Sequence, residues 1–119
     1  MLVIKEDQEL RMEEIRRVDF VELLLPVMKK LNPGFLPGND AAIRVYLDKK
    51  IRESKKWGLE TDAQVEKYIY LCMSYAIMNE RELPQNITNL LTWPGRKGHD
   101  KLVYLHHELI NITYVANDR

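Results

Sequence analysis

The sequence predicts an all-α fold, an irregular bundle of five or six helices with a central antiparallel helical hairpin. Its five glycines and five prolines gather at a few points, which mark turns between longer segments. Within these segments apolar residues recur at steps of three and four, the period of a helix. The most strand-like stretch, residues 112–115, is too short to pair alone. We therefore expect one helical domain over residues 18–119, preceded by an N-terminal arm or weak helix at 1–17.

The first segment changes character near residue 19. Residues 4–17 carry few apolar side chains among many charges, which predicts a weak, solvated helix or a frayed arm. A stronger helix is expected over 19–31, because Asp19 and Glu22 have the spacing of a capping box. Apolar residues cover nearly every face of this second part, as is typical of a central helix.

Two signals bear on how this helix is bounded. Pro26 lies inside it, and a mid-helix proline costs about 3 kcal/mol. The proline therefore predicts a kink, or a later helix start near residue 23. The sequence Asn32-Pro33-Gly34 is expected to end the helix.

The first arm of the predicted hairpin is a helix over residues 40–57. Asn39 or Asp40 is its expected N-cap, since both side chains accept hydrogen bonds from the first free N–H groups. Gly58 suits the left-handed residue that follows a helix, where a Cβ would be unfavourable.

The second arm is a helix over residues 61–78. Thr61 and Gln64 have the spacing of a second capping box. The side chains expected on its buried stripe are Val65, Tyr68, Ile69, Cys72, Tyr75 and Ala76. Because only the turn Gly58–Thr61 separates the arms, we expect them to be antiparallel.

Two further helices are expected in the C-terminal part. A short one runs from Asn86 to about Thr92. The last begins after Asp100 or His99 as cap and ends near Val115. Its core-facing residues are spaced three, four and three apart: Leu102, Leu105, Leu109 and Ile112.

Composition excludes several classes of function. Eighteen basic residues balance eighteen acidic ones, so no global charge attracts nucleic acid or an acidic membrane. A single cysteine, Cys72, excludes an internal disulfide and a cysteine-based zinc site and favours a reducing compartment. No apolar stretch reaches about 18 residues, so no membrane span is expected. With no signal peptide recognisable, the expected location is the cytoplasm.

No arrangement of residues indicates an enzyme, a metal site or a cofactor. His106 and His107 are adjacent, so on a helix their side chains point about 100° apart and do not readily share one ion. Cys72 lies mid-helix on the apolar stripe, away from any helix N-terminus that would lower its pKa. We expect His106 to border the core, His107 to face water and Cys72 to be buried and inert.

A basic helix face is the candidate binding site. Lys49, Arg52 and Lys56 share one face by steps of three and four, and Trp57 follows. Three interpretations stay open: a solvated face, a surface for an acidic protein partner, or a nucleic-acid patch.

Both tryptophans occupy similar places, beside glycine or proline at expected helix ends. Trp57 precedes Gly58, and Trp93 precedes Pro94. Each either anchors an interface or closes one end of the core.

A more specific pattern runs through most of the chain. Phe20 opens an apolar helix that ends at Leu31-Asn-Pro33, followed by Ile51-Arg-Glu-Ser-Lys-Lys-Trp-Gly58, Leu59-Glu-Thr61 and Val65-Glu-Lys-Tyr-Ile-Tyr-Leu71. A short apolar helix and Lys101-Leu-Val-Tyr-Leu105 complete it. In pattern and order, residues 18–110 resemble a family of small helical proteins encoded beside type VI secretion effectors in Gram-negative bacteria.

This resemblance implies a role without catalysis. The expected function is that of an accessory protein, as chaperone, adaptor or immunity partner, which forms a stoichiometric complex with a secreted effector. The resemblance supplies no site residues. The expected partner contacts are therefore those of the basic helix face described above: Lys49, Arg52, Lys56 and Trp57. The alternative is a small nucleic-acid-binding regulatory protein.

Overall fold

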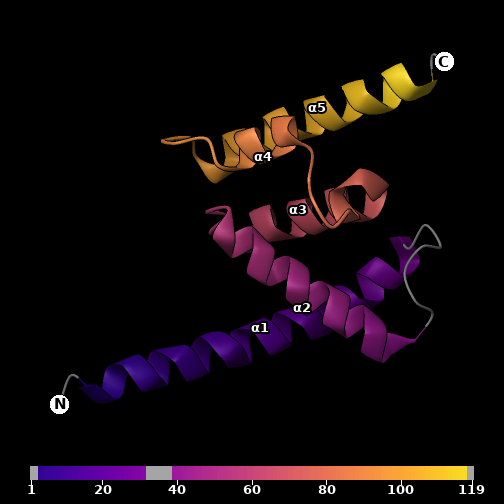
Figure 1. The fold of residues 1–119 in the computed structure, drawn as a ribbon. Helices are drawn as coiled ribbons and strands as arrows, with labels where there is room; N and C mark the ends of the chain where they lie inside the picture. The colour runs from indigo at the N-terminus through magenta and orange to yellow at the C-terminus, as the bar shows by residue number, and fades with distance from the viewer. Residues whose placement is uncertain (1–2, 32–38, 118–119) are drawn as a thin grey trace. The chain divides into compact units, whose positions relative to one another are not determined.

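The computed structural model describes residues 3–31 and 39–117 (Figure 1). Its elements in chain order are α1 (Val3–Leu31), α2 (Asp40–Lys56), α3 (Asp62–Ser74), the 3₁₀ helix η1 (Ala76–Asn79), α4 (Gln85–Leu91) and α5 (Gly98–Asn117). The all-α prediction is confirmed, since these described ranges contain no strand. The strand-like stretch 112–115 belongs to α5. The expected helix stop at residues 32–34 lies outside the described residues.

Internal packing divides the chain into two compact units, Met1–Ile51 and Arg52–Arg119. The boundary falls within α2, whose last residues belong to the second unit. The antiparallel hairpin therefore stays a prediction, as does the single domain over residues 18–119.

α1 is one continuous helix, so the expected break near residue 19 is wrong. Neither Asp19 nor residue 23 begins a helix, because the segment before them is rich in helix-forming Leu, Arg, Met and Glu and lacks Gly and Pro. Pro26 lies inside α1 on its exposed side. Instead of capping a helix, Glu22 accepts a hydrogen bond of 2.6 Å from Arg44 of α2.

Over its described side chains α1 is buried along one side, so the expectation of a central helix at residues 19–31 is also wrong. One row of side chains is buried: Val21, Leu24, Leu25 and Met28. The apolar side chains beside this row are exposed, with Leu23 at 71% and Val27 at 43%. The spacing of the buried row is that of a helix which uses a single stripe.

Ion pairs connect α1 with residues 40–48 of α2. They join Arg17 to Asp48 at 2.6 Å, Glu22 to Arg44 at 2.6 Å and Lys29 to Asp40 at 2.9 Å. The hydrogen bond and charge of Lys29 lower the pKa of Asp40, and Glu22 likewise raises the pKa of Arg44. The Arg17–Asp48 pair is part-buried, whereas the other two pairs are exposed. Because exposed ion pairs contribute little stability, the main effect of these two is on how the helices are aligned.

The helix caps predicted around α2 and α3 are present. Asn39 Oδ1 accepts from the Ala42 N–H at 2.7 Å, so Asn39 is the cap of α2. Gly58 follows α2 with a φ of 80°. At α3, Thr61 Oγ1 accepts from the Gln64 N–H at 3.1 Å and Gln64 Oε1 accepts from the Thr61 N–H at 3.4 Å, which completes the capping box.

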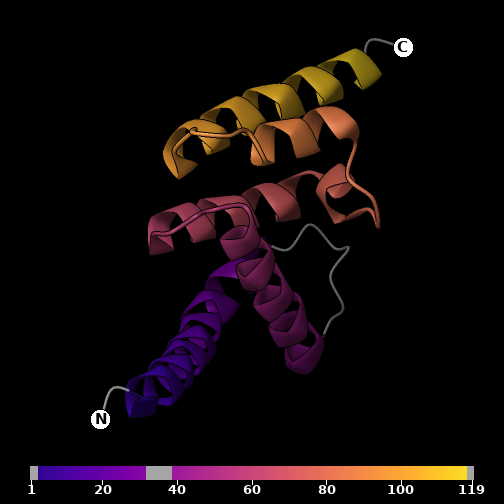
Figure 2. The ribbon, with the colours of Figure 1, turned by 60° about the vertical axis from the view of Figure 1, so that its left-hand side comes forward.

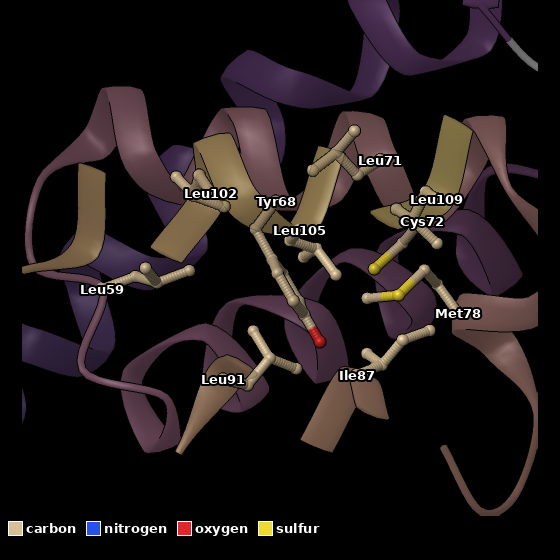
Figure 3. Close-up of a cluster of buried hydrophobic side chains, with 10 residues drawn as sticks. All are labelled: Leu59, Tyr68, Leu71, Cys72, Met78, Ile87, Leu91, Leu102, Leu105 and Leu109. Carbon is tan, nitrogen blue, oxygen red and sulfur yellow. The ribbon is translucent and has the colours of Figure 1, made fainter. Parts of the chain in front are cut away.

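The second unit has a hydrophobic core of its own, formed by the turn after α2 together with α3, η1, α4 and α5 (Figure 3). Its buried members are Leu59, Tyr68, Leu71, Cys72, Met78, Ile87, Leu91, Leu102, Leu105 and Leu109. α4 and α5 lie side by side in both views (Figures 1 and 2), and α3 contacts α5. Burial raises the pKa of Tyr68, whose ring extends into the middle of this core.

α3 ends at Ser74, so the expected continuation to Met78 is wrong. Tyr75 is extended, with φ −127° and ψ 108°, and η1 follows. This turn buries Met78, while Asn79 Nδ2 donates to the Cys72 carbonyl at 2.6 Å. Ala76, expected on the buried stripe, is exposed as a result.

The C-terminal helices follow the prediction except at one end. α4 begins and ends within one residue of the expected bounds. α5 begins at Gly98, so neither His99 nor Asp100 is its cap. The helix starts earlier because the Lys101 N–H already donates to the Lys97 carbonyl, at 3.0 Å. No helix within the described ranges has the length and apolar character needed to cross a bilayer.

Truncating Leu105 tests the core of the second unit. Leu105 is fully buried, so Leu105→Ala is expected to lower the free energy of unfolding by about 2–5 kcal/mol. Urea unfolding followed by tryptophan fluorescence measures this, since both tryptophans lie in the second unit. The matched control Val103→Ala, exposed on the same helix, should change stability by no more than about 0.5 kcal/mol. Equal losses in both variants would contradict the core assignment.

Gly98→Ala tests the contact between the start of α5 and the cap of α3. An added Cβ would lie 2.6 Å from Gln64 Oε1 and 3.1 Å from Leu59 Cδ2. The variant is expected to lose about 1 kcal/mol of stability, although alanine favours a helix, because Gln64 must leave its capping position. In a Gln64→Ala background, Gly98→Ala should lower the stability by less. A stabilised single variant in thermal unfolding would show that the contact is absent.

Candidate protein-binding site

Exposed apolar and aromatic side chains gather on the outer side of α5 and on the loop before it. Trp93, Val103, Tyr104 and Ile110 are each 39–45% exposed. The inner side of the same helix is occupied by Leu102, Leu105 and Leu109, all buried. Packing of the inner side therefore fixes which residues α5 presents outward.

Trp93, Arg96 and Tyr104 contact one another and form a group that we name the Trp93 cluster. The two ring centroids are 5.9 Å apart, with the ring planes inclined by 41°. The guanidinium carbon of Arg96 lies 4.4 Å from the centre of the Trp93 ring and 5.4 Å from that of Tyr104. Both distances are within the range of a cation–π interaction.

A tight turn places Arg96 over Trp93. The two middle residues are Pro94 and Gly95, and Gly95 has a φ of 76° that a residue with a side chain rarely adopts. The Arg96 N–H donates to the Trp93 carbonyl at 3.4 Å and closes the turn. Tyr104 then comes from α5, so the cluster joins the loop to the helix.

Two hollows adjoin this face of the second unit. Between α3 and α5 lies a groove of about 540 Å³, lined by Ala63, Gln64, Lys67, His99, Leu102, Val103, His106, His107 and Ile110. A more open hollow of about 700 Å³ lies between α4, the following loop and α5, and Trp93 forms part of its wall. Its other lining residues are Asn86, Asn89, Leu90, Thr92, Pro94 and Glu108.

His106 is the titratable group that the α3–α5 groove affects most clearly. It is half-buried, while His107 is exposed, as the sequence predicts. Burial, followed by the charges of Lys67 and His107, lowers the pKa of His106 below the ordinary 6.5. Its ring lies edge-on to that of Tyr75, with centroids 6.3 Å apart. The groove thus favours a neutral imidazole.

The expected partner contacts lie on α2 and directly after it. Lys49, Arg52 and Lys56 are exposed. Lys56 Nζ lies 5.2 Å from the centre of the Trp57 ring. Lys50, next to Lys49, is buried, with its Nζ 5.5 Å from the centre of the Tyr46 ring. That these residues bind a partner stays a prediction.

Trp57 closes one end of the second unit's core. Its ring is half-buried and packs against the core cluster. The indole N–H donates to the Tyr68 hydroxyl at 3.2 Å, and that hydroxyl donates to Glu53 Oε2 at 3.4 Å. Lys101 Nζ donates to the Trp57 carbonyl at 2.8 Å. Of the two interpretations of Trp57, these contacts favour the structural one, whereas the exposure of Trp93 favours an interface.

The described side chains offer no metal centre. No group of three or more His, Cys, Asp or Glu residues within the described ranges is arranged to hold an ion. Cys72 is buried in the core.

Comparison with known proteins gives no match to a family, to a characterised protein or to a solved structure. Its fold and its exposed surface define the chain as a small all-α protein with an exposed aromatic–arginine cluster.

Arg96 is the residue of this site that sequence reasoning missed. A local signal was available, because Pro-Gly at the centre of a turn brings the residues before and after it together. Applied to Trp93-Pro94-Gly95-Arg96, that rule places the arginine beside the indole. The contribution of Tyr104 depends on packing of α5 and has no comparable local signal.

The lowered pKa of His106 predicts that the folded protein becomes less stable in acid. The unfolded chain binds the proton more tightly, so the stability contributed by neutral His106 is present above about pH 6.5 and is lost as the pH falls below it. Between about pH 8 and about pH 5 the thermal midpoint should fall more for the native sequence than for His106→Gln. His107→Gln is the matched control and should keep most of the pH dependence of the thermal midpoint. Equal slopes for the native sequence and His106→Gln would refute the assignment.

Proposed function

We propose that this protein acts by binding another protein, without catalysis, through the outer face of α5 and the Trp93 cluster. The observation that carries the proposal is that Trp93, Arg96 and Tyr104 are exposed and contact one another. Tryptophan, tyrosine and arginine are the residue types that most often dominate binding energy at protein interfaces.

The contacts within the cluster favour binding further. Side chains that are already packed lose less conformational freedom when a partner covers them. Val103 and Ile110 extend the apolar surface along the same helix, and both line the α3–α5 groove. A partner could therefore bury aromatic and aliphatic area together, with Arg96 supplying a polar contact.

The finer part of the proposal is that the partner is a secreted effector and that this chain is its accessory protein. Support comes from the residue pattern over 18–110 that resembles proteins encoded beside type VI secretion effectors. A chaperone would use the apolar α3–α5 groove to cover effector surface. An immunity protein would use the Trp93 cluster to cover an active site.

Capture of the partner from the native host tests this function. Tagged protein is purified, and a protein retained in stoichiometric amount is identified by mass spectrometry. We expect Trp93→Ala/Tyr104→Ala to lose this protein, because the variant removes the aromatic contacts while the buried side of α5 is unchanged. Leu23→Ala, exposed on α1, is the control and should retain it.

Charge reversal on α2 distinguishes the two candidate surfaces. If Lys49→Glu/Lys56→Glu abolishes capture and Trp93→Ala/Tyr104→Ala does not, the partner binds the basic face of α2. Failure of the native protein to retain any protein in stoichiometric amount would contradict the proposed function itself.

A further inference from the structure

Arg96 is held by two aromatic rings. Trp93 and Tyr104 contact its guanidinium group through their rings, and these contacts leave its N–H groups available. Arg96 makes neither an ion pair nor a side-chain hydrogen bond to any residue in the described ranges. By contrast, Arg17 and Arg44 both pair with carboxylates.

The charges near Arg96 favour an anionic ligand group. Lys97 and Lys101 are its basic neighbours in sequence, and Asp100 is the single acidic residue between Trp93 and Tyr104. The Glu108 carboxylate, one helical turn beyond Tyr104, accepts a hydrogen bond of 2.7 Å from Asn86 Nδ2. Arg96 therefore has no acidic partner on the described part of the chain, and its guanidinium charge is not neutralised there.

We propose that the Trp93 cluster recognises an acidic segment of the partner protein, with an Asp or Glu carboxylate bound to the guanidinium of Arg96. This inference rests on the proposed protein-binding function and adds the chemistry of its ligand. A planar guanidinium donates two parallel hydrogen bonds to a carboxylate, and stacking on aromatic rings holds it in the orientation needed. The adjoining hollow combines the apolar wall of Leu90, Trp93 and Pro94 with polar side chains that include Glu108, so it accepts an uncharged, apolar residue beside the acid.

A protein carboxylate fits this site better than the phosphates of a nucleic acid. Nucleic-acid binding depends on several basic groups that contact successive phosphates. Around Arg96 the bases are few, Asp100 interrupts them, and the whole chain carries equal numbers of acidic and basic residues. One well-oriented arginine among aromatic side chains is suited to one carboxylate and its apolar neighbour.

The test begins by selecting ligands from a random phage-displayed peptide library on the immobilised full chain. Counter-selection against Trp93→Ala/Tyr104→Ala removes peptides that bind elsewhere. We expect the retained sequences to share an Asp or Glu next to an apolar residue. The most frequent sequence, made as a fluorescent peptide, is then titrated with the full chain and its variants by fluorescence anisotropy.

Arg96→Gln should raise the peptide Kd by about tenfold or more, the factor expected for loss of charge-assisted hydrogen bonds. Arg96→Lys should raise it about fivefold, since lysine keeps the charge and loses the planar pair of donors. Lys97→Gln is the matched control and should change it by less than about threefold. A peptide with the amide in place of its acid should bind the native chain weakly and be insensitive to Arg96→Gln.

Three results would overturn the inference. Retained peptides without an acid, bound equally by the native chain and Arg96→Gln, would leave the protein-binding function in place and remove the role of Arg96. Recovery of no peptide would overturn the inference, while effector capture from the host tests the function separately. Tighter binding of a single-stranded oligonucleotide than of any peptide, lost in Arg96→Gln, would assign the site to phosphate.

Discussion

Burial of one side of α5 is the constraint on which the second unit depends. Leu105 and Leu109 are fully buried against residues of α3, η1 and α4, so α5 can neither rotate nor shift without exposing them. That same constraint holds Tyr104 on the opposite side, where it meets the turn that carries Trp93 and Arg96. The exposed surface that carries the Trp93 cluster is thus a direct consequence of how the core is packed.

Features of the fold that depend on neighbouring residues could be predicted from the sequence. The caps at Asn39 and Thr61 and the left-handed Gly58 follow from side-chain chemistry within one turn, and the helical class follows from the apolar spacing. The break of α3 after Ser74 could not be predicted in this way. It depends on burial of Met78 by a turn, which is a tertiary effect that overrides the local helical pattern.

The candidate site also combines features that neighbouring residues predict with features that depend on tertiary packing. The sequence drew attention to Trp93 and to a basic face on α2, but it gave no reason to connect Arg96 with Tyr104, eight residues further on. Their contact requires both the turn at Gly95 and a fixed rotation of α5. Trp57 shows the reverse case, because its hydrogen bond to Tyr68 and its packing against the core are invisible in the sequence and give it a structural role.

The central claim, that the Trp93 cluster is formed before any partner binds, can be measured on the protein alone. Proton NMR of the full chain tests this through the side-chain methylene protons of Arg96. Stacking on Trp93 and Tyr104 predicts that ring currents shift these protons upfield and that Trp93→Ala returns them towards ordinary arginine values. Ordinary values in the native protein, unchanged by that substitution, would contradict the claim.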